Sequence, residues 1–200
     1  ADFIEYFGKQ AAKRHKNDSK SIGVNWDRAH DLLKIFTKEK PLPFAQIDMH
    51  LIESFRDFLL KAPRGGNKSG TISQNTASTY FTLFKAALHQ AFIDSYFDVD
   101  IAAKVKGISG VESRREYLTI EELNKLAATP CEYPMLKKAA FFSALTGLRH
   151  SDIRKMTWKE LSVEGDHYRI NFTQRKTGGV EHMPISEQAY LICGEPAEPD

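Results

Sequence analysis

An arginine and an aspartate stand three residues apart, just after a helix-ending glycine. Arg149 lies two residues after Gly147, and Asp152 falls on the same helical face as Arg149, close enough to orient its guanidinium. A guanidinium is planar, permanently charged and able to hold two oxygens of a phosphate group at once. Fixed donors of this kind meet the negative charge that builds on the non-bridging oxygens during phosphoryl transfer. The alternative interpretation is a surface ion pair that caps a helix.

A lysine at the tip of an expected hairpin is the second candidate group. Lys176 opens the run Lys-Thr-Gly-Gly, which is typical of a turn between two strands. In a phosphoryl-transfer site, a flexible ammonium there can donate a proton to a leaving 5′ oxygen. The alternative for an isolated hairpin lysine is solvated surface.

The elements that carry these residues are predicted from the spacing of apolar side chains. In the first half, apolar residues recur at intervals of three and four, which predicts a bundle of four helices over about 100 residues. The fourth helix is expected over 73–96, after a Gly-rich loop at 65–70, with a polar face that includes Lys85. The four stripes are Phe3, Phe7 and Ala11; Trp26, Ala29, Leu33 and Phe36; Met49, Ile52, Phe55 and Leu59; and Ala77, Phe81, Phe84, Leu88 and Ala91.

A basic, Gly-containing segment separates this bundle from a second domain. We expect a helical domain over 1–105, a linker over 106–116 and a second domain over 117–200. Thr119 and Glu122 fit a capping box, which predicts a helix over 120–128. The stretch 135–145 is apolar nearly all round, which indicates a helix buried within the domain.

The period of the pattern changes after a short helix expected around 151–156. Tyr168, Ile170 and Phe172 alternate with polar residues, which predicts a strand, and 180–185 can return as its partner. The predicted fold class is mainly α with a small antiparallel β-sheet.

Composition excludes several classes. The longest nearly apolar stretch, 139–145, is too short to cross a bilayer, so we expect no membrane partner and a cytoplasmic protein. The two cysteines, Cys131 and Cys193, offer no metal-ligand spacing, and we expect no metal and no cofactor. The net charge is only +2, but the charged residues are unevenly distributed along the chain. Basic residues cluster at Lys9, Lys13, Arg14, His15, Lys16 and Lys20 and at Lys104, Lys106, Arg114 and Arg115, and Glu195, Glu198 and Asp200 offset them.

Taken together, these segments resemble the tyrosine recombinases of the phage-integrase family. The resemblance rests on Thr146-Gly-Leu-Arg-His-Ser-Asp-Ile153 together with Thr173-Gln-Arg-Lys-Thr-Gly-Gly179 and Met183-Pro-Ile-Ser186. The entry Leu118-Thr-Ile-Glu-Glu-Leu123 is similar to the start of that family's catalytic domain, and Ser73-Gln-Asn-Thr-Ala-Ser-Thr-Tyr80 to its SAM-like core-binding domain. The sequence of these segments is closest to those of integrases from Bacteroidetes mobile elements such as conjugative transposons.

The resemblance implies a helical SAM-like domain followed by part of a catalytic domain. Arg149 would be the first catalytic arginine, Asp152 the acidic residue that supports it, and Lys176 the general acid of the hairpin. The implied substrate is double-stranded DNA, which the family breaks and rejoins through a 3′-phosphotyrosyl link without metal or nucleotide. The implied assembly is a homo-tetramer on paired recombination sites.

The family also requires His-x-x-Arg and a nucleophilic tyrosine downstream of the hairpin. No His-x-x-Arg occurs in the sequence, and Tyr190 falls in an apolar helical pattern typical of core. We therefore expect a fragment of a longer recombinase that binds DNA without cleaving it. The alternatives are a non-catalytic DNA-binding accessory or regulatory protein, and a helical protein-interaction module. Candidate DNA contacts, by analogy with the family, are Asn75, Thr79, Lys85, Arg114 and Arg115.

Overall fold

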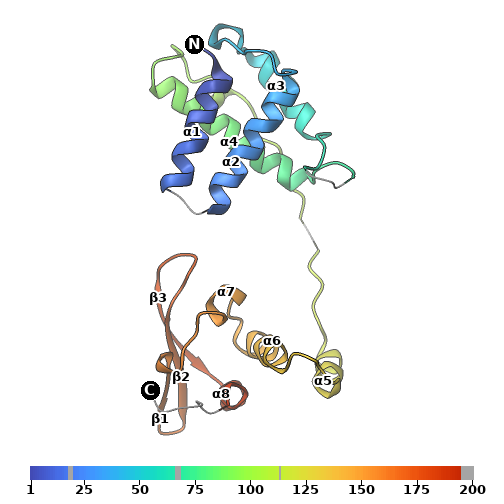
Figure 1. Cartoon of the computed structure of the whole chain (residues 1–200), viewed down its shortest axis with the longest axis vertical. Helices are drawn as coiled ribbons and strands as arrows, with labels where there is room; N and C mark the ends of the chain where they lie inside the picture. Colours follow the sequence, from blue (N-terminus) through green and yellow to red (C-terminus); the bar gives the residue numbers. More distant parts are fainter. Residues whose placement is uncertain (18–19, 66–68, 113, 195–200) are drawn as a thin grey trace. The chain divides into compact units, whose positions relative to one another are not determined.

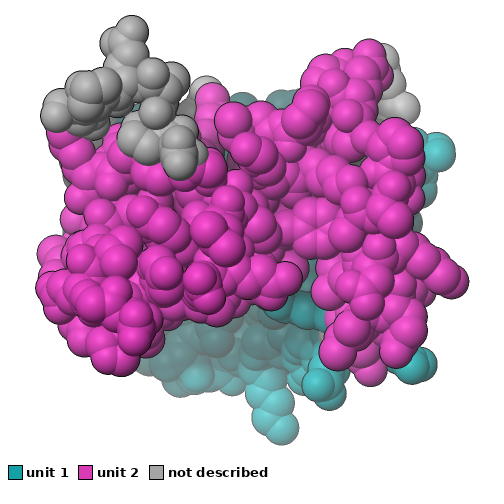
Figure 2. All heavy atoms as spheres, turned by 90° about the horizontal axis from the view of Figure 1, so that it is seen from below, with its two compact units in different colours: residues 1–115 teal, residues 116–200 magenta. Residues whose placement is uncertain are grey.

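The computed structural model describes residues 1–17, 20–65, 69–112 and 114–194, without the side chains of residues 16, 17 and 20. The chain divides into two compact units, Ala1–Arg115 and Glu116–Asp200, which Figure 2 draws in different colours. Three features singled out in the sequence lie outside the described residues. They are positions 66–68 of the glycine-rich loop, the side chains of Lys16 and Lys20, and the acidic residues Glu195, Glu198 and Asp200.

The first unit is the helical bundle that the apolar spacing predicts. Its four α-helices are α1 (Phe3–Asn17), α2 (Lys20–Phe36), α3 (Met49–Leu59) and α4 (Gln74–Ile93), joined by the short 3-10 helix η1 (Phe44–Gln46) and followed by η2 (Ala102–Lys104) (Figure 1). All five residues of the predicted α4 stripe, from Ala77 to Ala91, are fully buried. Phe84 lies at the centre, with its ring 4.6 Å from that of Phe55 and 5.8 Å from that of Phe3. The predicted stripes therefore build one core, except that Phe36 is only partly buried and Met49 is exposed.

Side-chain caps fix where the helices of this unit begin. Asp48 accepts a hydrogen bond from the Leu51 amide at 2.8 Å, and Ser73 accepts one from the Thr76 amide at 3.2 Å. Helix α4 ends at Ile93, three residues before the predicted Tyr96, because Ser95 has a φ of 62°. This left-handed residue cannot continue a right-handed helix.

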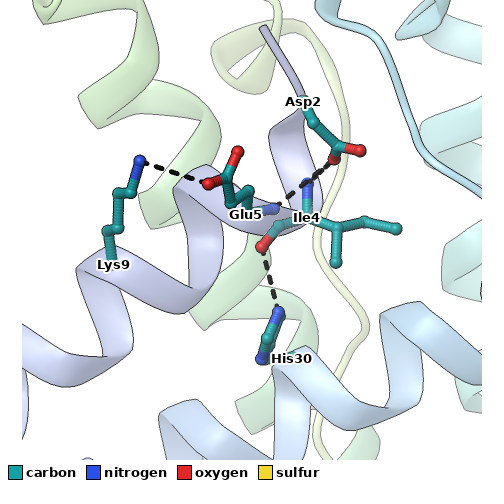
Figure 3. Close-up of polar contacts among 5 residues, drawn as sticks. All are labelled: Asp2, Ile4, Glu5, Lys9 and His30. Atoms are coloured by element: carbon teal, nitrogen blue, oxygen red, sulfur yellow. Dashed lines mark hydrogen bonds and ion pairs between the residues drawn. The ribbon is translucent and has the colours of Figure 1, made fainter.

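Helix α1 is held against α2 by a histidine (Figure 3). His30 Nε2 donates a hydrogen bond of 2.9 Å to the carbonyl oxygen of Ile4, in the first turn of α1. The His30 ring lies against Gly8, where an added Cβ would stand 3.1 Å from the ring. Asp2 caps the same turn by accepting from the Ile4 amide at 2.7 Å, and Glu5 forms an ion pair with Lys9 at 3.6 Å. Burial and the nearby Lys34 charge lower the pKa of His30.

The second unit contains helices and one small sheet. In chain order it holds α5 (Ile120–Ala128), α6 (Pro134–Thr146), α7 (His150–Ile153), η3 (Trp158–Glu160), β1 (Leu161–Glu164), β2 (His167–Thr173), β3 (Val180–Ile185) and α8 (Glu187–Cys193). The sheet is antiparallel in the order β1-β2-β3, with Ile170 opposite both Leu161 and Met183. The capping box of Thr119 and Glu122 is confirmed, with both hydrogen bonds formed. Strand β1 is an addition to the predicted hairpin.

The core of this unit is small, and one prediction about it is wrong. Phe142, Leu148, Ile170, Phe172 and Ala189 are its buried residues. Helix α6 forms where expected but is not buried, since Met135 is 74%, Leu136 64% and Leu145 43% exposed. Helix α6 packs on α7 and α8, and Lys137 of α6 donates to the carbonyls of Ala127 and Thr129 at the end of α5. An apolar pattern all round a helix indicates that every face of the helix can pack against other elements. It does not show which elements pack there.

Two further searches concern membranes and metals. Within the described ranges, no helix has both the length and the apolar character required to cross a bilayer. Nor do three or more His, Cys, Asp or Glu side chains from that same part of the chain gather where they could hold a metal ion.

Candidate functional site

The turn that carries Arg149 is fixed on both sides. Helix α6 ends at Thr146 and is capped by Gly147, whose φ of 69° lies in the left-handed region that favours glycine. Thr146 Oγ1 donates to the Phe142 carbonyl at 2.6 Å and accepts from the Leu148 amide at 3.3 Å. Leu148 is buried in the core and anchors the turn. Arg149 is thereby placed at the N-cap of α7 with its side chain exposed.

The Arg149 guanidinium is oriented by a glutamine, not by Asp152. Its NH1 group donates to Gln174 Oε1 at 3.1 Å. The expected ion pair between Arg149 and Asp152 is absent from the contacts of these two described residues. Asp152 is buried, at 3% exposure, and Oδ1 accepts a hydrogen bond of 2.8 Å from the Arg175 amide. The carboxylate therefore joins α7 to the hairpin, one residue before Lys176.

Gln174 links Arg149 to the hairpin turn. Its Oε1 also accepts from Thr177 Oγ1 at 2.6 Å, and its Nε2 donates to Glu181 at 2.8 Å. Its backbone closes the turn, since the amide donates to the Gly179 carbonyl and the carbonyl accepts from the Gly178 amide. Sequence reasoning missed Gln174. The signal was present, because Gln174 continues the alternation of Ile170 and Phe172 one residue beyond the end of β2.

Lys176 lies exposed in the turn between β2 and β3. The structure brings Arg149 and Asp152 into one pocket of about 250 Å³, and Lys176 is not among the residues that line it. Lys155 donates to the Thr173 carbonyl at the base of the hairpin and adds a cation near the end of β2. The pocket is lined by Thr146, Gly147, Leu148, Arg149, Asp152, Phe172, Gln174, Glu181 and Met183. Its lining holds one guanidinium, that of Arg149, together with the carboxylates of Asp152 and Glu181, so an anion in this pocket must lie against Arg149 and away from both carboxylates.

The polar face of α4 holds a second segment of its own unit. Residues 105–111 run along α4, and we refer to them as the strap. Asn75 makes two hydrogen bonds with the Val111 backbone, of 2.9 and 2.8 Å, and Lys85 donates to the Val105 carbonyl at 2.5 Å. Gln74 donates to the Ser109 carbonyl at 2.9 Å and Ser78 to the Ile108 carbonyl at 2.7 Å.

The strap occupies some of the side chains on α4 that are candidate DNA contacts. Asn75 and Lys85 are engaged within the unit, whereas Thr79 is exposed and donates only to the Asn75 carbonyl of its own helix. Arg114 and Arg115 are exposed in a stretch without helix or strand. The start of the expected linker is therefore hydrogen-bonded to α4, while these two arginines are accessible to a ligand.

Two side chains of the basic cluster at the end of α1 have partners on α2. His15 lies 2.6 Å from Asp27, and the Arg14 guanidinium lies over the Trp26 ring at 5.1 Å. Tyr190, expected to be core, is half-buried and packs against Tyr168, with ring centroids 4.7 Å apart and an interplanar angle of 35°.

Comparison with known proteins gives a family match over the first unit. Residues 2–106 match the family described as phage integrase SAM-like domain. No curated protein sequence matches the chain.

Solved structures match over both units. A lambda integrase dimer bound to a COC′ core site has a TM-score of 0.65 at 17% identity, covering 96% of this chain and 53% of that one. A lambda integrase tetramer bound to a Holliday junction has a TM-score of 0.64 at 18% identity, with 91% and 49% covered. XerH site-specific recombinase bound to palindromic difH substrate has a TM-score of 0.60 at 16% identity, with 93% and 54% covered. The fold is thus shared, and the chain spans about half the length of these structures.

Proposed function

Since this chain belongs to the phage integrase SAM-like domain family, we propose that it is the DNA-binding part of a site-specific recombinase. The observation that carries the proposal is the family match over residues 2–106. The solved structures of similar fold are recombinases bound to DNA, which supports the same ligand for this chain. The proposed partner is double-stranded DNA that carries recombination sites.

The second unit contributes the first part of the phosphodiester site. Arg149, oriented by Gln174, holds the non-bridging oxygens of the phosphate that is attacked. In the complete reaction a tyrosine hydroxyl attacks the phosphorus, the bond to the 5′ oxygen breaks, and Lys176 gives that oxygen its proton. Asp152 supports the site by fixing the hairpin at Arg175. The energy of the broken bond is kept in the link between the tyrosine and the DNA phosphate, so the reaction consumes no nucleotide.

The nucleophile lies in another part of the full-length protein. The 200 residues contain no His-x-x-Arg, and Tyr190 is half-buried against Tyr168. The proposal therefore assigns DNA binding without cleavage to this chain, and a homo-tetramer on paired sites to the full-length recombinase. It further assigns an origin in a Bacteroidetes conjugative transposon, on the resemblance of its sequence to integrases of those elements. It also assigns a cytoplasmic location, because the free cysteines Cys131 and Cys193 suit a reducing compartment.

Fluorescence anisotropy with a labelled random-sequence duplex tests the DNA-binding role. We expect a non-specific Kd of about 10⁻⁴ to 10⁻⁶ M at physiological salt, which weakens steeply as salt rises. Absence of any salt-dependent affinity would contradict the proposal and favour a protein-interaction module.

Denaturing electrophoresis after incubation with nicked duplex tests the assignment of the nucleophile. We expect no covalent adduct between DNA and the 200-residue chain. An adduct would show that a tyrosine within these residues attacks DNA. If the source gene instead stops at Asp200, the accessory DNA-binding protein replaces the recombinase.

A further inference from the structure

A pocket of about 310 Å³ in the first unit has two arginines in its lining and no carboxylate. It is lined by Arg28, Arg64, Gly65, Ile72, Ser73, Thr76 and Tyr80. Neither arginine forms an ion pair with any described residue. Two guanidinium groups at one pocket repel each other unless an anion lies between them. The pocket therefore has the charge of an anion site.

The position of Arg28 is set by the backbone that it touches. Its NH2 group donates to the Pro63 carbonyl at 3.2 Å, which uses one of the five N–H donors of the guanidinium. A Cβ added at Gly65 would stand 2.8 Å from Arg28 Cζ and 2.9 Å from its NH2. Only a residue without a side chain lets the guanidinium lie this close to the chain. The glycine thus leaves room for this position of Arg28, and the bond to Pro63 leaves other donors of the guanidinium for a ligand.

Arg64 is brought to the same pocket by a short ladder of backbone bonds. The Arg64 amide donates to the Gly70 carbonyl at 3.0 Å, and the Ile72 amide donates to the Ala62 carbonyl at 2.9 Å. These bonds, with the bridge between Pro63 and Thr71, connect the end of α3 to the start of α4. The pocket is therefore built before any ligand arrives, which reduces the entropy lost on binding.

The remaining polar groups of the pocket are neutral hydroxyls. Ser73 Oγ and Thr76 Oγ1 are 2.8 Å apart and hydrogen-bonded to each other, and Tyr80 lies one turn further along α4. Guanidinium groups with hydroxyls suit a phosphate oxygen, because both can donate to it and neither repels it. The pocket is open to solvent at the exposed Arg64, so a phosphate within a polymer can reach it.

We propose that Arg28 and Arg64 bind one backbone phosphate of duplex DNA. This site lies in the first unit and is separate from the pocket at Arg149, but it rests on the proposed DNA-binding function. Phosphate contacts of this kind position a protein on the duplex and carry no sequence information. The pair therefore contributes equally to every duplex, whatever its sequence.

The test compares duplex affinity and its salt dependence in Arg64→Ala, Arg28→Gln and Arg56→Ala. Arg56 lies on α3, is paired with Asp57 at 3.3 Å and is outside the pocket, so Arg56→Ala is a control with the same loss of charge as the other two. We expect Arg64→Ala and Arg28→Gln to weaken Kd by about tenfold and to lower the slope of log Kd against log salt by about 0.9. The control should change neither by a comparable amount.

Arg64 is exposed, so Arg64→Ala decides the matter even if Arg28→Gln unfolds when its bond to Pro63 is lost. Far-ultraviolet circular dichroism identifies an unfolded variant. If the wild-type chain binds the duplex and Arg64→Ala behaves like Arg56→Ala, the phosphate site is wrong while DNA binding stands. If the wild-type chain does not bind at all, the proposed function itself fails.

Discussion

Substitutions of Asp152 separate two roles for this buried carboxylate. The structure shows it accepting from the Arg175 amide, whereas the sequence led us to expect that it orients Arg149 directly. Asp152→Asn keeps an oxygen that can accept from the amide but removes the charge. Asp152→Ala removes both. The two variants therefore differ only if the acceptor matters.

The magnitudes follow from the hydrogen bond of 2.8 Å at a residue that is 3% exposed. A hydrogen bond to a charged group contributes about 1.5–3 kcal/mol, and a neutral one about 1 kcal/mol. Asp152→Ala should therefore destabilise the junction of α7 and the hairpin by about 2 kcal/mol. Asp152→Asn should destabilise it by about 1 kcal/mol, because a weaker bond replaces the stronger one.

Amide hydrogen exchange followed by NMR measures this local free energy in the intact chain. At about 1.4 kcal/mol for each factor of ten, the Arg175 amide should exchange about 30-fold faster in Asp152→Ala and about fivefold faster in Asp152→Asn. The amides of α4, in the other unit, serve as the internal control. Equal acceleration in both variants would mean that the charge alone matters, and no acceleration in Asp152→Ala would refute the link to the hairpin.

Three further predictions concern the strap, α1 and the turn before α7. Asn75→Ala removes two hydrogen bonds to Val111, so amide exchange in 109–111 should be about tenfold faster. Thr79→Ala should leave this exchange unchanged, because the Thr79 hydroxyl bonds only its own helix. Equal effects of the two variants would contradict the role of Asn75 in holding the strap. The pKa of His30 is lowered in the folded state, so the unfolded chain binds the proton first and stability is lost as pH falls below 6.5. Urea unfolding at several pH values should show a smaller loss of stability in His30→Gln than in the wild-type chain. An identical pH profile in the two proteins would exclude this role of His30. Gly147→Ala should lower the free energy of unfolding by about 1 kcal/mol, because alanine is strained at a φ of 69°. The strain is the whole cost, since an added Cβ meets no atom within 4 Å. An unchanged thermal unfolding curve would show that the turn adjusts to the alanine.

The helices of the first unit could be predicted from the sequence because their signals are local. The stripe from Ala77 to Ala91 and the cap at Ser73 each depend on residues within one helix. The role of Asn75 could not be predicted in this way. Its partner Val111 is 36 residues away, and an exposed polar side chain has the same pattern whether it faces solvent, DNA or a neighbouring backbone.

The candidate site was predicted in its residue types but not in its bonds. Arg149, Asp152 and the hairpin were identified because a glycine, a helix start and a turn mark them in the sequence. Helical spacing put Asp152 on the face of Arg149, but a carboxylate of short reach bonds whatever donor the fold presents, and that donor is the Arg175 amide. Gln174 continues the alternation of β2, but this pattern does not identify a partner, and Arg149 is 25 residues away in the sequence.

Every hydrogen bond from α4 to the strap ends on a main-chain atom of the strap. The side chains of α4 therefore determine the path of the strap, and the strap's own side chains do not. In a library of variants, the exposed positions 109 and 111 can be randomised while the path is kept. Proline at position 111 is the exception, since it lacks the amide that donates to Asn75. Related chains can thus diverge in this stretch and still leave the first unit along the same route.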